Sequence, residues 1–518
     1  MDTLHWLSEY ELISDISGNI KMAMVVSASS HFEYEYGILT DILNDFDDKK
    51  AEPIILDKKG EFEKNPDGNH PKMDFINFKL SKSDYSETEP NDPFDWENTT
   101  RSGILTTNSD LDSVDWEEQT RSIDTAKRSV SVVSLNESWE DQTRAVERAL
   151  RYLSMQDMNT RWEEDFDKIQ NQGKEIPFRA WVQDPFICFQ KKIPSNNLLG
   201  QWVVRESTLM YSIGQAKMMD FFIALELSSN PKLNLRSHAS RLLLEGGNML
   251  SVDGKLLIGK DLFQKNLENE RKSNPKWTEA DMKELFLFCL QVNQVCVIGT
   301  ESTSESFDLK LKDGVLTHIS SYQPFFHIDL FINFGPKDDD GNRVVYLGSP
   351  LLALEMLEAA DESAETGGKF THPDHEKLLD GLSVKIKEKA IQIENDFINP
   401  IEKQLRKENF VVKRTPLYVY GEPYINKYIC CTWNNALTEV SQKNGRSQIF
   451  LPSYVTTKKG KAHKSHNRRL NYLENQVYST YKKDFDLVTK IPLGRLFRYT
   501  AQVSGSLRCM TKILRREG

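Results

Sequence analysis

Short apolar runs alternate with longer amphipathic stretches along most of this chain. Residues 20–58 give the first case, with an apolar strand at Ile20–Val26, a helix at Glu33–Phe46 and a short apolar run at Pro53–Leu56. Alternation of strands and helices is typical of an α/β fold. The alternation resumes at Phe178 and continues to the C-terminus, so we predict one α/β architecture on both sides of the intervening segment.

The periodicity after Phe178 predicts the following elements. The strands are Trp202–Val204, Met249–Ile258, Val295–Ile298, Phe325–Phe334, Val344–Leu347, Val411–Tyr420, Ile429–Glu439, Gln448–Leu451, Leu487–Ile491 and Leu507–Leu514. The helices are Tyr211–Leu227, Glu279–Cys289, Leu351–Ala359, Glu376–Phe397 and Asn471–Phe485. In the helix at Glu376–Phe397, apolar residues recur every three or four positions, which indicates packing against a core.

Residues 59–140 interrupt this pattern with a composition rich in Asp, Glu, Ser, Thr, Asn and Pro. Such a segment buries too little apolar surface to offset the entropy of ordering, so we predict an acidic, disordered insertion. The folded domain is then expected in two parts, residues 1–58 and residues 141–518.

A tryptophan-containing motif recurs within this insertion. Residues 95–101 read Asp-Trp-Glu-Asn-Thr-Thr-Arg, and related sequences surround Trp116 and Trp139. Trp and Arg are favoured anchors at protein interfaces, and tandem copies raise avidity, so Trp96, Trp116 and Trp139 are candidates for binding a protein partner. Alternatively, these tryptophans dock on the chain's own domain or begin helices, and the sequence leaves both interpretations open.

Composition narrows the functional classes. A net charge of −11 over 518 residues argues against a protein whose whole surface binds nucleic acid. The chain's 6 cysteines are too few for a disulfide framework, which favours a reducing compartment. Because the sequence has no membrane-length apolar run and no signal-peptide pattern at its start, we expect a soluble, cytoplasmic protein that does not enter a membrane.

Four short polar clusters interrupt apolar strands, where a buried charge needs a partner or a function. Each alone has an ordinary explanation: Asp184 can cap a turn, His327 can be a satisfied core histidine, and Cys509 can be a small apolar side chain. If residues 325–334 form a strand, His327 and Asp329 point to the same face. With Glu245, these residues supply the acids, histidine and cysteine needed for nucleophilic attack on a cationic carbon.

The clusters also resemble a known group of enzymes. Trp-Val-Gln-Asp at 181–184, Glu-Gly-Gly-Asn at 245–248, His-Ile-Asp at 327–329 and a late Cys509 after a Ser-Gly-Ser loop are, in this order, similar to the guanidino-group-modifying enzymes of the pentein superfamily. The first motif resembles peptidyl-arginine deiminases. The second, with Asn434-Asn435 and the Leu-Pro-Ser-Tyr sequence after them, is more similar to agmatine or arginine deiminases. The resemblance covers about residues 20–57 and 178–518 and implies a five-bladed, pseudo-symmetric α/β propeller with its site at the central axis.

The resemblance implies a role for each of three catalytic residues. Cys509 is the expected nucleophile, and His327 is the expected acid for the leaving ammonia and base for the hydrolytic water. Glu245 is expected to hold the His327 ring, while Gly246 and Gly247 are expected to let the backbone pass close to the substrate.

Four further residues are predicted to bind the substrate. A guanidinium is planar and cationic, so Asp184 and Asp329 are the candidates to hold its nitrogens. Asn248 is predicted to contact the substrate, although an Asp is common at that position in arginine deiminases. Arg508 either contacts a substrate carboxylate, lowers the pKa of the neighbouring thiol or faces away, and the sequence leaves these alternatives open.

The function expected on these grounds is hydrolysis of a guanidino group to a citrulline-type ureido product and ammonia, through a covalent thiouronium on Cys509. The substrate would be a small guanidine, such as free arginine or an arginine-derived amine, or an arginine of a protein, and no metal or organic cofactor is expected. One alternative is amidinotransfer, in which an amine replaces water. Another is a non-catalytic pentein that binds partners through the Trp-containing repeats.

Overall fold

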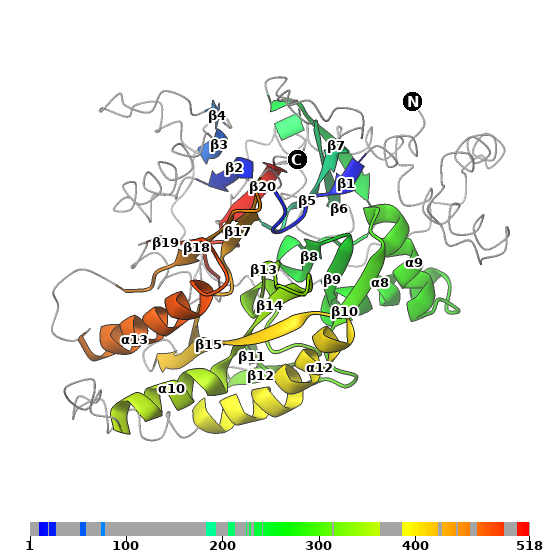
Figure 1. Ribbon diagram of the computed structural model, residues 1–518. Helices are drawn as coiled ribbons and strands as arrows, with labels where there is room; N and C mark the ends of the chain where they lie inside the picture. Colours follow the sequence, from blue (N-terminus) through cyan, green and yellow to red (C-terminus); the bar gives the residue numbers. More distant parts are fainter. Residues whose placement is uncertain are drawn as a thin grey trace, which may run out of the picture.

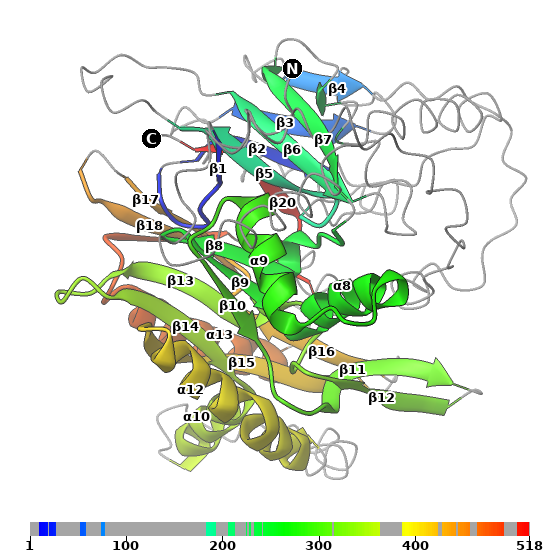
Figure 2. The ribbon, with the colours of Figure 1, turned by 90° about the vertical axis from the view of Figure 1, so that its right-hand side faces the viewer.

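The computed structural model describes sixteen separate stretches of the chain. They are residues 10–18, 20–26, 52–57, 74–77, 183–192, 206–212, 224, 227–228, 233–240, 242–312, 315–362, 386–422, 427–441, 444–455, 464–491 and 505–516. They form a mixed α/β fold in which several short, curled sheets occupy the interior and the helices lie toward the outside (Figure 1, Figure 2).

Six sheets make up the described fold, and each is named here by the first strand of its repeating unit. The β5 sheet holds β1 (Tyr10–Leu12), β5 (Phe186–Lys191), β6 (Ser207–Ser212) and β7 (Leu235–Ser240), and the β8 sheet holds β8 (Met249–Val252), β9 (Lys255–Gly259) and β10 (Gln294–Ile298). The β13 sheet holds β13 (Ile332–Lys337), β14 (Arg343–Ser349), β15 (Val411–Glu422) and β16 (Lys427–Thr432). The β17 sheet holds β17 (Leu437–Val440), β18 (Ser447–Pro452) and β19 (Leu487–Ile491), and the β20 sheet holds β20 (Thr511–Arg516), β2 (Ile20–Val26), β3 (Glu52–Asp57) and β4 (Asp74–Asn77). The sixth is a hairpin of β11 (Ser304–Lys312) and β12 (Val315–Ser321).

All sheets except the hairpin repeat one pairing pattern. In each, the first strand runs antiparallel to the second, and the second runs parallel to the third. A parallel pair needs a long crossover connection, commonly a helix. The described crossovers fit this rule, and the helices that form them are α8 (Lys260–Ser273), α9 (Glu279–Leu290), α10 (Pro350–Glu362), α12 (Asn399–Lys407) and α13 (Lys464–Tyr481).

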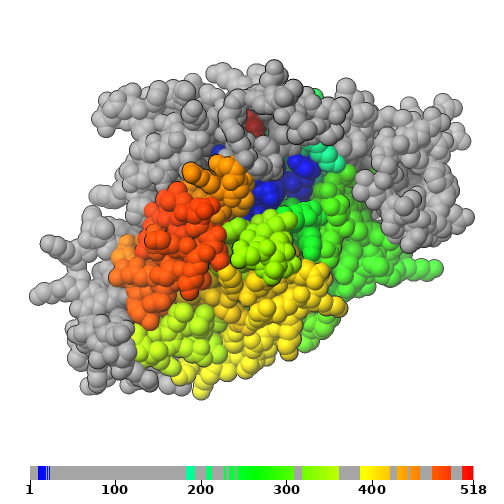
Figure 3. Space-filling view, viewed as in Figure 1, coloured from blue at the N-terminus to red at the C-terminus, as the bar shows by residue number. Residues whose placement is uncertain are grey.

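The N-terminal and C-terminal segments close this arrangement. β20, near the C-terminus, pairs with β2 and also contacts β5. Residues 10–18 add β1 to the β5 sheet and form a bridge from Ser17 to Val440. In the space-filling view these blue N-terminal residues lie between the orange residues of the β17 sheet and the green residues around β8 (Figure 3).

Buried side chains fill the space between sheets and helices. Ile386, Ala390, Ile393 and Phe397 are all buried, and a five-residue π-helix (Glu394–Ile398) leads from them into α12. The prediction that this apolar stripe packs against the core is confirmed for the described residues. The cysteines are all buried and unpaired by disulfides.

Three predicted strands are interrupted by turns. Residues 325–334 are not one strand, because Ile328–Leu330 form a 3-10 turn and β13 begins only at Ile332. The predicted strand at Ile429–Glu439 divides into β16 and β17 of two different sheets. Likewise, residues 507–510 form a turn before β20. The apolar pattern did not show these breaks, since the polar residues of the turns are buried as deeply as the strands.

Other predictions differ from the structure or fall outside it. Residues 249–258 form a hairpin, whose turn places Asp253 and Gly254 at positive φ. Tyr211 lies in β6, which continues to Ser212, instead of beginning a helix, and α8, α12 and the β11–β12 hairpin were not predicted. Within the predicted insertion, β4 pairs with β3, and the domain boundaries at residues 58 and 140 stay a prediction. The expected helix at Glu33–Phe46 and the expected strand at Trp202–Val204 lie outside the described residues.

Candidate active site

The polar clusters of the sequence share one place in the fold. Each lies in the loop immediately before the first strand of a sheet: Asp184 before β5, Glu245 before β8, His327 before β13 and Cys509 before β20. The β17 sheet has a residue at the same position, Asn435, which was not assigned a role from the sequence. Five loops at equivalent positions of five similar sheets therefore carry all the candidate catalytic groups.

Hydrogen bonds join these five loops in a closed ring, in which each loop bonds the loop of the next sheet. The bonds run from Gly247 N to Asp184 Oδ1 (3.0 Å), from Asn248 Nδ2 to Phe326 O (2.7 Å), from Asn435 Nδ2 to Asp329 O (3.3 Å), from Cys509 N to Asn435 Oδ1 (3.0 Å) and from Gln183 N to Cys509 O (3.3 Å). The ring brings together residues separated by up to 326 positions in sequence, from Gln183 to Cys509.

His327 lies between two carboxylates. Its Nδ1 is 3.9 Å from Asp184 Oδ1, and its Nε2 is 3.8 Å from Glu245 Oε2. The imidazole is 7% exposed and packs against the Phe326 ring at 4.4 Å between centroids. Both distances are longer than a direct hydrogen bond. Each ring nitrogen nevertheless has a carboxylate oxygen within 4 Å, which can attract a proton or a cationic substrate nitrogen placed between them. This arrangement suits a histidine that donates and accepts protons.

Glu245 is oriented by Asn248, a predicted substrate-binding residue. Asn248 Nδ2 donates to Glu245 Oε2 at 2.9 Å, and Gln323 Nε2 donates to Asn248 Oδ1 at 2.9 Å. Because both ends of its amide are engaged, Asn248 serves here to hold Glu245 toward His327. A contact between Asn248 and substrate stays a prediction.

The two glycines of the Glu-Gly-Gly-Asn motif lie too close to neighbouring atoms for a side chain to fit. A Cβ on Gly247 would lie 2.3 Å from His327 Nδ1, and a Cβ on Gly246 would lie 1.9 Å from the backbone oxygen of Gln183. Real Cβ atoms do not come this close to other heavy atoms. In the structure the glycines therefore let this loop pass the imidazole and the neighbouring loop, whereas close passage of the substrate stays a prediction.

Asp329 is the most buried acid of the site, with no measurable exposure. Its Oδ2 lies 3.4 Å from Arg508 Nε and 3.8 Å from Cys509 Sγ, while its Oδ1 has no hydrogen-bond partner. Burial raises the pKa of Asp329 to about 6, although the charges of Arg508 and His327 lower it. An unpartnered, buried carboxylate oxygen beside the thiol is an acceptor available to a cationic N–H donor.

The Cys509 thiol is 5% exposed. Burial first, and then the charges of Asp329 and Asp184, raise the pKa of the thiol well above its usual range. A cation bound between these carboxylates would cancel part of that effect and favour the thiolate.

Arg508 is held by an acid that was not predicted from the sequence. Asp15 Oδ1 lies 2.6 Å from Arg508 Nη2, and Asp15 Oδ2 accepts from the backbone N–H of Ser251 at 2.5 Å. The structure places the Arg508 guanidinium between the carboxylates of Asp15 and Asp329. A contact between Arg508 and a substrate carboxylate stays a prediction. Asp15 stands in a short loop 493 residues before Arg508, and no local pattern marked it.

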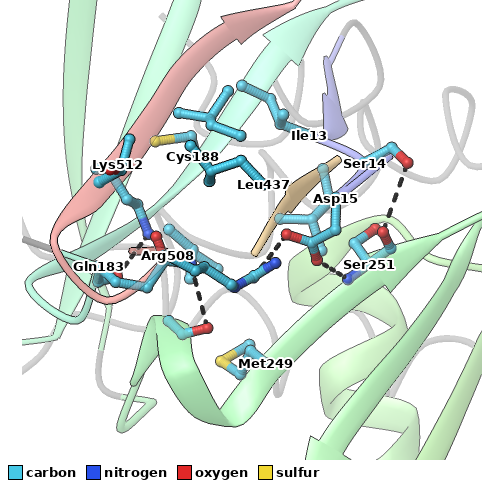
Figure 4. A pocket seen from close by; sticks show the side chains of 15 residues that line it. Ile13, Ser14, Asp15, Gln183, Cys188, Met249, Ser251, Leu437, Arg508 and Lys512 are labelled. Atoms are coloured by element: carbon cyan, nitrogen blue, oxygen red, sulfur yellow. Dashed lines mark hydrogen bonds and ion pairs between the residues drawn. The ribbon is translucent and has the colours of Figure 1, made fainter. Parts of the chain in front are cut away.

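A cavity of about 50 Å³ adjoins the ring of loops (Figure 4). Gln183, Gly246 and Arg508 line it, and each neighbours a candidate catalytic residue in sequence. Figure 4 shows Arg508 directed toward Asp15, and the Lys512 ammonium directed toward Gln183, whose backbone oxygen it bonds at 2.8 Å. Burial lowers the pKa of Lys512.

Some predicted features are not tested by the described residues. Trp96, Trp116, Trp139 and Trp181 lie outside them. Among the residues that the structure describes, no helix is long and apolar enough to cross a membrane. In the same ranges, no group of three or more His, Cys, Asp or Glu side chains could hold a metal ion.

Comparison with known proteins gave matches to solved structures. No family model and no curated sequence matches the chain. A crystal structure of a protein provisionally assigned as a peptidyl-arginine deiminase is similar at a TM-score of 0.46 and 11% identity, covering 99% of this chain and 100% of the other. An agmatine deiminase of C. jejuni is similar at a TM-score of 0.44 and 10% identity over 98% and 97% of the two chains. The agmatine deiminase of Enterococcus faecalis is similar at a TM-score of 0.45 and 9% identity over 98% and 96%.

These deiminases belong to the group that the sequence motifs resemble. The likeness extends over nearly the whole chain, but at TM-scores below 0.5 it does not by itself assign an activity.

Proposed function

We propose that this chain is a cysteine-dependent hydrolase of a guanidino group, built as a five-bladed α/β propeller. The repeated strand pairing of five sheets and the closed ring of their loops support the propeller. One observation carries the activity: a buried thiol lies 3.8 Å from a carboxylate that has a free oxygen, within the ring of loops that also holds a histidine between two further acids. A planar cation with several N–H donors matches these acceptors.

In the first step of the proposed reaction, the thiolate attacks the bound guanidinium and ammonia leaves. Asp184 and Asp329 bind the guanidinium nitrogens, and Cys509 Sγ attacks the central carbon as thiolate. The C–N bond to one terminal nitrogen breaks, and His327 supplies the proton with which ammonia leaves. The product of this step is a thiouronium on Cys509.

Hydrolysis completes the cycle. His327 accepts a proton from a water molecule as the oxygen bonds to the same carbon, and the C–S bond breaks to return the thiolate. The net reaction converts one guanidinium and one water into one ureido product and one ammonium. Because Cys509, His327 and Asp329 are all buried, a guanidino group on a slender aliphatic chain is the proposed substrate.

The direct test is to incubate the purified protein with agmatine, free arginine and an arginyl peptide, and to measure ammonia and ureido product. We expect equimolar release of both from at least one substrate. Replacing His327 with Gln should lower kcat by roughly 10²- to 10⁴-fold, the usual contribution of general acid–base catalysis. His318→Gln is the matched control, because His318 bonds the backbone oxygen of Ser306 and is not part of the ring of loops.

Two outcomes would contradict guanidine hydrolysis. Absence of ureido product from all three substrates, with the His327 and His318 variants indistinguishable, would refute hydrolysis. A new guanidino compound formed only after addition of glycine or another amine would identify amidinotransfer instead.

A second expected result concerns Gly247. In Gly247→Ala the new methyl group must displace the His327 ring, and misplacement of a catalytic group by about 1 Å costs on the order of 10²-fold in rate. The measurement is kcat/KM for the guanidine together with the melting temperature. Gly335→Ala is the control, because its Cβ would crowd Tyr346 and Val344 at 2.9–3.2 Å without touching the site. Equal activity losses in the two variants would contradict this role for Gly247.

A further inference from the structure

Arg508 is bonded to Asp15 and only loosely paired with Asp329. Its guanidinium is buried between the two carboxylates. Arg508 Nη2 lies 2.6 Å from Asp15 Oδ1, whereas Arg508 Nε lies 3.4 Å from Asp329 Oδ2 and has no hydrogen-bond partner. Figure 4 shows the arginine side chain directed toward Asp15. Asp15 therefore holds the arginine that precedes the candidate nucleophile.

A guanidinium of the protein itself thus lies beside a site proposed to bind a guanidinium. Arg508 carries the same planar cation and the same fork of N–H donors as the proposed substrate. Asp329, the acid proposed to bind that substrate, has one oxygen without a partner. A shift of Arg508 by about 0.5 Å would shorten the distance from its Nε to Asp329 Oδ2 to that of an ordinary hydrogen bond. Arg508 would then neutralise Asp329 and compete with the substrate for it.

Asp15 is itself anchored by three sheets. Its backbone N–H donates to Ser251 O at 2.7 Å, and its Oδ2 accepts from Ser251 N at 2.5 Å. Its backbone oxygen accepts from Thr438 Oγ1 at 3.1 Å and from Arg516 Nη2 at 2.8 Å. Ser251 belongs to β8, Thr438 to β17 and Arg516 to β20. The Asp15 carboxylate therefore keeps one position beside Arg508.

Arg508 needs a carboxylate partner at every pH at which the protein is folded. Burial lowers the pKa of Arg508, but the charges of Asp15 and then of Asp329 outweigh burial and raise it. A buried cation is stable only when it is paired. Asp15 supplies the pairing charge from outside the ring of loops, so Asp329 does not have to supply it.

We propose that Asp15 is a positioning residue that retains the Arg508 guanidinium and thereby keeps Asp329 available to the guanidinium of the substrate. The inference rests on the proposed function for the identity of the substrate. It adds a residue of the N-terminal segment to a site that is otherwise built from the five loops.

The first test measures KM and kcat of Asp15→Asn for agmatine, which has no carboxylate that Arg508 could contact. An amide has one acceptor oxygen, and the Ser251 N–H engages it, so the NH₂ group would face Arg508 and the ion pair would be lost. Arg508 should then pair with Asp329. We expect KM to rise at least about tenfold, the effect of one hydrogen bond to a charged group, and kcat to change by less than about threefold.

Two further variants separate this effect from damage to the N-terminal segment. In Asp15→Asn combined with Arg508→Met both charges are gone, so the internal competitor is absent and the rise in KM should be reversed. Ser14→Ala is the control, because Ser14 Oγ accepts from the backbone N–H groups of Ile16 and Ser17. Its loss loosens the same segment without changing a charge, so the melting temperature should fall and KM should not change.

A second test needs no activity. It compares the effect of Asp329→Asn on the melting temperature at pH 8 in two backgrounds. In the wild-type background Arg508 keeps Asp15 as its partner, and the substitution should raise the melting temperature. In the Asp15→Asn background Arg508 depends on Asp329, so the same substitution leaves a buried cation unpaired and should lower the melting temperature by several degrees.

A folded Asp15→Asn variant with the wild-type KM, or one in which Asp329→Asn still raises the melting temperature, would overturn the proposal. If Asp15→Asn does not fold, the double variant decides: a KM close to that of wild type supports the proposal, and a rise of about tenfold without Arg508 present contradicts it. A reversed effect of Asp329→Asn in a protein that hydrolyses no guanidine would refute the proposed function and leave the hold of Asp15 on Arg508 intact.

Discussion

Replacing Cys509 with alanine is expected to abolish ammonia release from the guanidine substrate, with kcat lowered by at least about 10⁴-fold. The reason is that the proposed mechanism forms and breaks a covalent bond at Sγ, and removal of a nucleophile leaves only binding and electrostatic stabilisation. The fold should tolerate the change, because alanine removes only the sulfur of a small side chain. Steady-state kinetics and a thermal melt on the same preparation measure both effects.

Cys296→Ala provides the comparison for Cys509→Ala. Cys296 lies buried within strand β10, outside the ring of loops, and is therefore a packing residue. Its replacement should cost some stability and leave kcat unchanged. If Cys509→Ala retains turnover comparable with Cys296→Ala, covalent catalysis at Cys509 is ruled out.

Asp329→Asn is expected to change activity and stability in opposite directions. Loss of a charged acceptor for the guanidinium should lower kcat/KM by roughly 10²- to 10⁴-fold, since hydrogen bonds between charged groups are among the strongest in proteins. The melting temperature should rise by a few degrees, because the substitution removes a buried charge with an unpartnered oxygen. Arg508 keeps its ion pair with Asp15, so no cation is left unpaired.

The stability gain should depend on pH with a definite sign. The pKa of Asp329 is raised to about 6 by burial, above its value in the unfolded chain, so the folded state binds this proton more tightly. The cost of the ionised carboxylate is therefore fully present above pH 6 and is relieved as the pH falls from about 6 to about 4. Melting temperatures of wild type and Asp329→Asn should differ at pH 8 and converge toward pH 4.5.

Asp253→Asn is the matched control, and its expected change in melting temperature has the opposite sign to that of Asp329→Asn. Burial alone would raise the pKa of Asp253, but the hydrogen bonds and charge of Arg343 outweigh burial and lower it. Asp253 Oδ1 lies 2.7 Å from Arg343 Nη2, and Asp253 stands in the β8–β9 turn, outside the ring of loops. Its replacement should lower the melting temperature at neutral pH and leave activity unchanged. A fall in the melting temperature of Asp329→Asn at pH 8 would show that Asp329 is mainly a structural ion-pair partner.

The sequence was informative wherever one residue type was needed at a fixed local spacing. Glu245, Gly246 and Gly247 were selected because the Glu-Gly-Gly-Asn motif resembles that of guanidino-group-modifying enzymes; in the structure Gly247 passes the His327 ring and Gly246 passes the Gln183 backbone. The apolar stripe ending at Phe397 was predicted because helical periodicity is a local property. The acid, histidine and cysteine clusters were found because charges rarely interrupt apolar runs without a reason.

Breaks between strands were harder to predict. Residues 429–439 were predicted to form one strand, yet the chain leaves the β13 sheet at Thr432 and enters the β17 sheet at Leu437. Hydrophobic periodicity reports burial, and the turn at residues 433–436 is as buried as the strands beside it. The same limit applies to the turn at residues 507–510.

The residue types and local motifs were enough to single out a thiol, a histidine and three acids, which were expected within or beside apolar strands. Which groups contact the sulfur and the neighbouring arginine depends on how the sheets pack. Asn435 reaches Cys509 across 74 residues, and Asp15 reaches Arg508 across 493, because neighbouring sheets bring their loops into one ring. Contacts of this kind depend on how the sheets pack against one another, and a lone asparagine or aspartate in a short loop carries no local pattern that records that packing.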